Sequence, residues 1–250
     1  MNNNKKLLVG FVLNIILIIL AYSSFAPIFS LSVYGELTSK SLSGTFRFFT
    51  NDGNLYSTLV TCVLISFQIS ILLFKKNPNI IRNNILYLLS LGSAVSELII
   101  LFVVVFLLMP FFGSKILIGN YTMFNLHFLM PVIVTIRFIF FEYKRIKINY
   151  TDSLYGSIPV LIYGVIILFL IIIKVFNEEN KKIPYPFLNI YGNPWWATLL
   201  YFIVLFGFTF GFCIFLNYLN DLFEDVLLDN KEKNSNFMIT PSEEQNTYEL

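Results

Sequence analysis

Few side chains in this sequence combine a reactive type with a position that suits catalysis. Thr50 precedes a long apolar run by one helical turn, with Asn54 four residues on, and His127, the single histidine of the chain, stands near the start of another run. A Thr hydroxyl becomes a useful nucleophile when a neighbouring base takes its proton, and neutral imidazole suits that step near pH 7. The set is suited to nucleophilic catalysis, and Asn54 is a candidate donor to a developing oxyanion.

A second group of polar side chains predicts a different kind of site. Ser90, Ser93 and Glu97 share one helical face by their spacing, and Glu97 falls in the middle of its apolar run. An intramembrane carboxylate marks an ion or substrate path. The alternative function is therefore a carrier or small-ligand binder centred on Glu97 and Ser93. A polar stripe on the preceding run would face that site: Asn54, Thr58, Thr61 and Gln68.

The composition sets the elements that must position these residues. Hydrophobic residues make up 56% and charged residues 13% of the 250 residues, and the mean hydropathy is +0.73, whereas soluble domains carry about 25% charged residues. A helix needs about 20 apolar residues to cross a bilayer. The sequence predicts an all-α polytopic membrane protein, a six-transmembrane-helix bundle within a membrane domain of residues 1–220. The spans are Leu7–Ala26, Asn54–Phe74, Ile85–Phe112, Thr122–Phe141, Leu154–Ile173 and Trp195–Tyr218.

The basic residues predict the orientation of the spans. With the N-terminus inside, the short inner segments hold eight Lys and Arg in 28 residues and the outer ones six in 57. We therefore expect a multi-pass protein of the cell membrane with both termini cytoplasmic. The first span resembles a signal peptide but is longer than the usual ~7–15 residue apolar core, so we expect it to be retained. Residues 221–250 form an acidic, polar cytoplasmic tail, predicted to extend the last helix and then to be disordered.

Depth in the membrane decides which polar groups meet. At ~1.5 Å per residue, His127 lies roughly 8 Å below the outer end of its span and Thr50 just above the outer end of the preceding stripe, so the two are expected to converge. Glu97 is near mid-membrane and Arg137 near the inner end of its span. We expect Arg137 to extend to the cytoplasmic headgroups or to neighbour Gln68 rather than to pair with Glu97.

The net charge and the available ligand side chains restrict the partners that this protein is expected to bind. A net charge of +2 gives no surface for nucleic acid, and one histidine without clustered carboxylates falls short of a metal site. No cofactor is expected, and the predicted partners are membrane lipids and a lipid-like substrate. The aromatic, proline-rich loop 181–194 before the sixth span is read either as part of an aromatic belt or as a lid on a lipid-accessible cavity.

Three short motifs resemble a known family. Phe46-Arg47-Phe48-Phe49-Thr50 opens the second span, His127 with Pro131 lies on the fourth, and Tyr185-Pro186-Phe187 precedes the sixth. Over about Leu42–Asn220 they resemble the six-span androgen-induced membrane proteins, whose animal members hydrolyse fatty acid esters of hydroxy fatty acids, and look closer still to microbial relatives without an assigned function. The resemblance implies a lipid-ester hydrolase at the outer leaflet, with Thr50 as nucleophile and His127 as base. From their positions in the sequence, Asn54, Glu97 and Tyr185 are the candidate substrate-binding residues.

Overall fold

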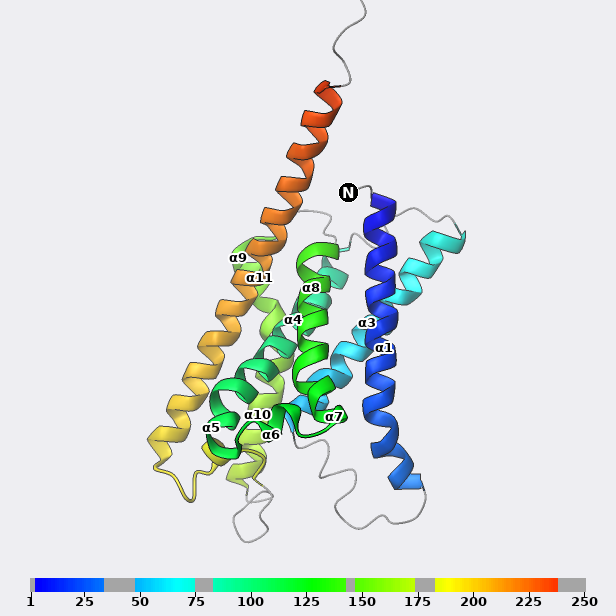
Figure 1. Ribbon diagram of the computed structural model, residues 1–250. Helices are drawn as coiled ribbons and strands as arrows, with labels where there is room; N and C mark the ends of the chain where they lie inside the picture. Colours follow the sequence, from blue (N-terminus) through cyan, green and yellow to red (C-terminus); the bar gives the residue numbers. More distant parts are fainter. Residues whose placement is uncertain (1–2, 34–47, 75–82, 143–146, 174–182, 238–250) are drawn as a thin grey trace, which may run out of the picture.

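The computed structural model describes residues 3–33, 48–74, 83–142, 147–173 and 183–237, and within these ranges the chain forms helices and turns without strands (Figure 1). Six of its helical segments are long and apolar enough to cross a membrane, which confirms the all-α six-span fold. These segments are Lys5–Ala26, Phe49–Phe74, Asn84–Leu108, Tyr121–Phe141, Tyr150–Ile172 and Trp195–Val226.

Six long helices form the frame of the bundle, and shorter helical elements complete three of the six spans. The long helices are α1 (Asn3–Val33), α3 (Phe49–Phe74), α4 (Asn84–Phe102), α8 (Met130–Phe141), α10 (Ile158–Ile172) and α11 (Trp195–Phe237). The shorter elements are η2 (Val103–Leu108), α5 (Met109–Phe112), α6 (Lys115–Ile118), α7 (Tyr121–Phe124), η3 (Asn125–Leu129), α9 (Tyr150–Ser153), η4 (Leu154–Ser157) and η5 (Pro186–Leu188).

Helix α4 is the centre of the bundle. It packs against α3, α8, α11 and the η4 turn, and the span to which it belongs, Asn84–Leu108, is more deeply buried than any other described span. Small residues allow this close packing, because a Cβ added at Gly92 would lie 3.2 Å from the backbone oxygen of Gly156 on η4. The polar face of α4, with Ser90, Ser93 and Glu97, is therefore enclosed by protein on its whole length.

Two spans contain a wide π-helical turn next to a proline. The turn Val103–Leu108 lies just before Pro110, and the turn Asn125–Leu129 just before Pro131. Proline has no N–H to donate, so the preceding turn loses a regular hydrogen bond and can widen to the i→i+5 pattern, which recurs at functional sites. His127 lies in the middle of the second π turn.

The two ends of the bundle differ in what they carry. α1 begins and α11 leaves the bundle at the same end, whereas α3 begins at the opposite end, near α6, α7 and η5 (Figure 1). We call the latter the loop end and the former the terminal end. α11 continues past residue 220 to Phe237, so residues 230–237, predicted to be disordered, are helical in the structure. Residues 238–250 lie outside the described ranges.

Candidate functional site

Thr50 lies in the first turn of α3, because this helix begins at Phe49, five residues before the predicted start of the span. The backbone N–H groups of a first helical turn have no partner within the helix. Here the N–H of Phe49 donates to the hydroxyl of Tyr185, 3.0 Å away, and the hydroxyl of Thr50 meets the same phenol. A residue of the loop before α11 thus caps the helix that carries Thr50.

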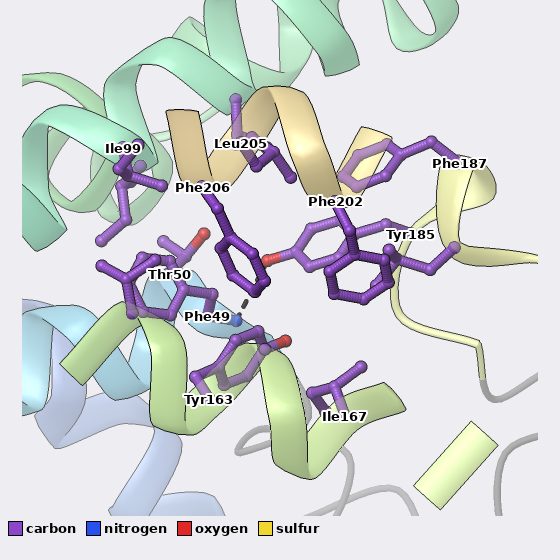
Figure 2. A pocket seen from close by; sticks show the side chains of 15 residues that line it. Phe49, Thr50, Ile99, Tyr163, Ile167, Tyr185, Phe187, Phe202, Leu205 and Phe206 are labelled. Atoms are coloured by element: carbon purple, nitrogen blue, oxygen red, sulfur yellow. Dashed lines mark hydrogen bonds between the residues drawn. The ribbon is translucent and has the colours of Figure 1, made fainter. Parts of the chain in front are cut away.

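A small, almost wholly apolar cavity lies beside these groups (Figure 2). It has a volume of about 50 Å³ and lies between α3, α4, α10, α11 and η5. At roughly 10–15 Å³ for each water centre, that space holds a few waters. Its polar groups are the hydroxyls of Thr50, Tyr163 and Tyr185, which gather at one side of it.

Tyr185 is the loop residue that brings these hydroxyls together. Its side chain is 5% exposed and its ring stacks on Phe187 with centroids 5.2 Å apart. Burial disfavours the phenolate and raises the pKa of Tyr185 to about 12. Because its oxygen accepts from Phe49 and the phenol keeps its proton, Tyr185 is chemically suited to donate a hydrogen bond to an oxygen near Thr50.

His127 is held by a backbone group that the sequence did not reveal. Its Nδ1 lies 2.7 Å from the carbonyl oxygen of Ile116, on the short helix α6. A carbonyl only accepts, so Nδ1 carries the proton and a neutral ring keeps its lone pair on Nε2, the arrangement that a general base needs. This contact was not predictable, since a backbone carbonyl has no side-chain signature and α6 follows an irregular turn.

Asn54 joins the two helices that carry Thr50 and His127. Its fully buried Nδ2 donates to the carbonyl oxygen of Thr50 at 2.6 Å and to that of Leu126 on η3 at 3.1 Å. Both amide hydrogens are therefore committed to backbone oxygens. Asn54 thus positions α3 against η3, and its predicted role as a donor to an oxyanion requires one of these two hydrogen bonds to break.

The backbone segments that carry Thr50 and His127 lie close together, but the two side chains do not face each other. The Thr50 hydroxyl faces the cavity and Tyr185, whereas the imidazole faces Ile116 and is not among the residues that line the cavity. Within the described ranges, no hydrogen bond joins the two side chains. A working pair therefore needs the imidazole to turn toward Thr50.

A separate polar network surrounds Arg137 on α8. Arg137 is 2% exposed and donates to Asn14 and Thr61 at 3.1 Å each and to Ser90 at 3.0 Å. Ser90 in turn donates to the carboxylate of Glu142. The expectation that Arg137 extends to the headgroups is wrong, because acceptors from α1, α3 and α4 bind its two terminal amino groups inside the bundle, although its buried Nε has no partner among the described residues.

Gln68 is linked to Arg137 indirectly, through the side-chain amide of Asn14. Its Oε1 accepts from Nδ2 of Asn14 at 2.9 Å, while Oδ1 of Asn14 accepts from Arg137. Asn14 therefore links α1 to both α3 and α8. The polar stripe predicted on α3 is otherwise enclosed as expected: Asn54, Thr61 and Gln68 are buried, and Thr58 is half-buried.

Glu97 lies within the bundle with its carboxyl group buried. It is 0% exposed, and the hydroxyl of Ser57 lies beside its carboxyl group, although neither carboxyl oxygen has a partner at regular hydrogen-bond geometry. The hydroxyls of Ser57, Ser93 and Ser96 are likewise buried without a partner. Arg137 is near enough to act on Glu97 electrostatically, yet no ion pair joins them in the part of the chain that the structure describes. Buried polar atoms without partners are costly, so this cluster is a candidate binding site.

Neither a metal-binding cluster among the described residues nor a known relative indicates what these sites do. Among the residues that the structure describes, no group of three or more His, Cys, Asp or Glu side chains could hold a metal ion. Comparisons with protein-family models, with curated proteins and with solved structures found no match for this chain. The fold and the two buried sites thus define a polytopic helical membrane protein with an apolar cavity at one end and a charged cluster in its core.

Proposed function

We propose that this protein is an integral membrane hydrolase of lipid esters, with Thr50 as its nucleophile. The observation that carries the proposal is a buried Thr hydroxyl that faces an apolar cavity together with the protonated Tyr185. Apolar walls favour the hydrocarbon part of a substrate, and the few hydroxyls favour its ester group. The roles that the resemblance implies for Thr50 and His127 agree with this proposal.

The proposed reaction proceeds through an acyl-enzyme. Oγ1 of Thr50 attacks the ester carbonyl carbon while its proton passes to Nε2 of His127, and Tyr185 donates to the carbonyl oxygen as it gains charge. The ester C–O bond then breaks and the alcohol leaves with the proton from His127. Water, activated by the same imidazole, cleaves the threonyl ester and releases the fatty acid. His127 must turn from Ile116 to reach Thr50 in the substrate complex.

Hydrolysis of a fluorogenic long-chain ester tests the proposal. The purified full chain in nanodiscs is incubated with 4-methylumbelliferyl oleate, and we expect Thr50→Val to lower kcat by about 10² or more while Thr50→Ser keeps activity. Ser57→Ala is the matched control, because Ser57 is a buried hydroxyl on the same helix outside the cavity. Equal turnover by wild type and Thr50→Val would exclude Thr50 as the nucleophile.

A second candidate function rests on Glu97. We propose, as the alternative, a carrier or small-ligand binder whose site is the buried carboxyl of Glu97 with the hydroxyls of Ser57 and Ser93. Proton movement into proteoliposomes, followed with a trapped pH dye, tests it. Movement that Glu97→Gln abolishes and Thr50→Val leaves unchanged supports the carrier, and the absence of proton movement counts against it.

A further inference from the structure

A groove runs along the lipid-facing side of α10 and α11. Its volume is about 250 Å³, and most of its walls are apolar side chains. Val165, Leu199 and Ile203 on these walls are exposed, so in a membrane they contact hydrocarbon. The groove begins beside Trp195, the first residue of α11, which places one end of it near the loop end of the bundle.

The groove and the Thr50 cavity are separated by a thin wall. Gly164, Phe202 and Phe206 line both of them. A Cβ added at Gly164 would lie 3.0 Å from two ring atoms of Phe206, so the missing side chain lets this ring rest against α10 (Figure 2). The rings of Phe202 and Phe206 have centroids 5.7 Å apart. Rotation of the Phe206 side chain would join the two spaces.

Thr198 adds an independent sign of a ligand in the groove. It is 2% exposed, lies one turn into α11 and lines the groove, and its hydroxyl has no hydrogen-bond partner. A buried hydroxyl without a partner is costly in an apolar setting. An ester carbonyl near the headgroup level is the polar atom that a bilayer supplies at this place.

We propose that the groove between α10 and α11 is the entry portal for an acyl chain of a membrane lipid. The ester carbonyl accepts a hydrogen bond from Thr198, and the chain passes Phe206 toward Thr50. The occupant follows from the surroundings, because a groove with apolar walls that opens sideways into a bilayer is filled by hydrocarbon. The cavity of about 50 Å³ admits a chain only when Phe206 turns aside. Delivery to Thr50 rests on the proposed hydrolase function, whereas the lipid site does not.

Photocrosslinking tests the portal. The full chain is placed in nanodiscs with phosphatidylcholine that carries a diazirine in one acyl chain, and labelled residues are mapped by mass spectrometry. We expect label in the groove and also at Ile167, which lines the cavity and is 3% exposed, so bulk lipid does not reach it. Phe206→Ala should raise the label at Ile167 about fivefold, and Gly164→Leu should lower it about fivefold.

Matched variants decide the outcome. Gly207→Leu is the control on α11, since nothing lies within 4 Å of a Cβ at Gly207, and it should leave the label at Ile167 unchanged. Thr198→Val should remove any preference for the ester-linked probe over its ether-linked analogue, which has no carbonyl. The portal is overturned if the cavity stays unlabelled in both wild type and Phe206→Ala. It is also overturned if Thr198→Val leaves the preference for the ester-linked probe unchanged. Both tests remain decisive even where Gly164→Leu fails to fold.

The two proposals can fail separately. Crosslinking needs no turnover, so the same mapping is repeated with Thr50→Val. Label at Ile167 in that variant, together with ester hydrolysis that does not depend on Thr50, would retain the portal and reject the nucleophile. Dependence of hydrolysis on Thr50 with an unlabelled cavity would retain the nucleophile and reject the portal.

Discussion

Tyr185 connects three features of the candidate site: it caps α3, lines the cavity and meets the Thr50 hydroxyl. Its phenol is protonated over the whole physiological range because burial raises its pKa. A neutral phenol is a donor at the place where an ester oxygen would gain charge, while Asn54, the donor that the sequence suggested, is occupied with backbone oxygens. In the proposed reaction the donor to the ester oxygen therefore comes from a loop rather than from a helix.

The raised pKa of Tyr185 predicts how stability changes at alkaline pH. The folded state holds this proton up to a pKa of about 12, against 10.0 for an ordinary tyrosine, so its contribution is complete below about pH 10 and is lost between about pH 10 and 12. We expect the thermal midpoint of the purified protein to fall over this range, and to fall less steeply for Tyr185→Phe. Identical slopes for the two proteins would contradict a buried, protonated phenol.

His127→Gln separates positioning from base catalysis. A glutamine amide can still donate to the Ile116 carbonyl, but it has no basic nitrogen, so the helices should stay packed while the activity falls by about 10²–10⁴. Ester hydrolysis and the thermal midpoint are measured on the same preparation. An unchanged midpoint with full activity would show that the imidazole takes no part in the reaction.

Among the elements, α1, α3, α4 and α8 are joined by the Arg137 network rather than by apolar packing alone. Arg137 accounts for contacts to three other helices, and Asn14 extends them to Gln68. The spacing of polar residues in the sequence predicted the polar faces of α3 and α4. It did not predict that side chains from four helices would meet at Arg137. Helix rotation is set by packing between helices, and Asn14 is a single polar residue in an apolar run that shows no face of its own.

Removal of the guanidinium should destabilise the bundle. Arg137→Met leaves the oxygens of Asn14, Thr61 and Ser90 buried without this donor and removes the positive charge that acts on Glu142, and we expect a cost of about 3–5 kcal/mol. Lys147→Ala is the control, since Lys147 and Asp225 form an exposed pair 3.9 Å apart, expected to contribute less than about 1 kcal/mol. Thermal midpoints of both variants in the same detergent are compared. Similar midpoints would mean that the network is structurally dispensable.

For the whole molecule, the spans were predictable because each is a long apolar run, and the structure differs from the prediction mainly at the ends. α3 begins at Phe49 rather than Asn54, and this shift brings Thr50 into the helix. The cavity was not predictable, since it depends on how Tyr163, Phe202 and Phe206 from distant parts of the chain pack together. The sequence thus indicated the candidate residues, whereas packing between distant segments determined their neighbours.

The orientation in the membrane remains a prediction at this scale. The excess of Lys and Arg in the segments at the terminal end predicts that this end is cytoplasmic. In a background without Cys62 and Cys213, an impermeant maleimide added to intact cells should label Gly192→Cys at the loop end and not Asn149→Cys, which is exposed at the terminal end. The reverse pattern would place the Thr50 site at the cytoplasmic side.

The most direct test of the hydrolase proposal is the position of a covalent adduct. A long-chain fluorophosphonate reacts with an activated hydroxyl as the O–P bond forms and fluoride leaves, and the modified residue is then identified by mass spectrometry. We predict one adduct on Thr50, absent from Thr50→Val and strongly reduced in His127→Gln. An adduct elsewhere, or equal labelling of wild type and Thr50→Val, would contradict it.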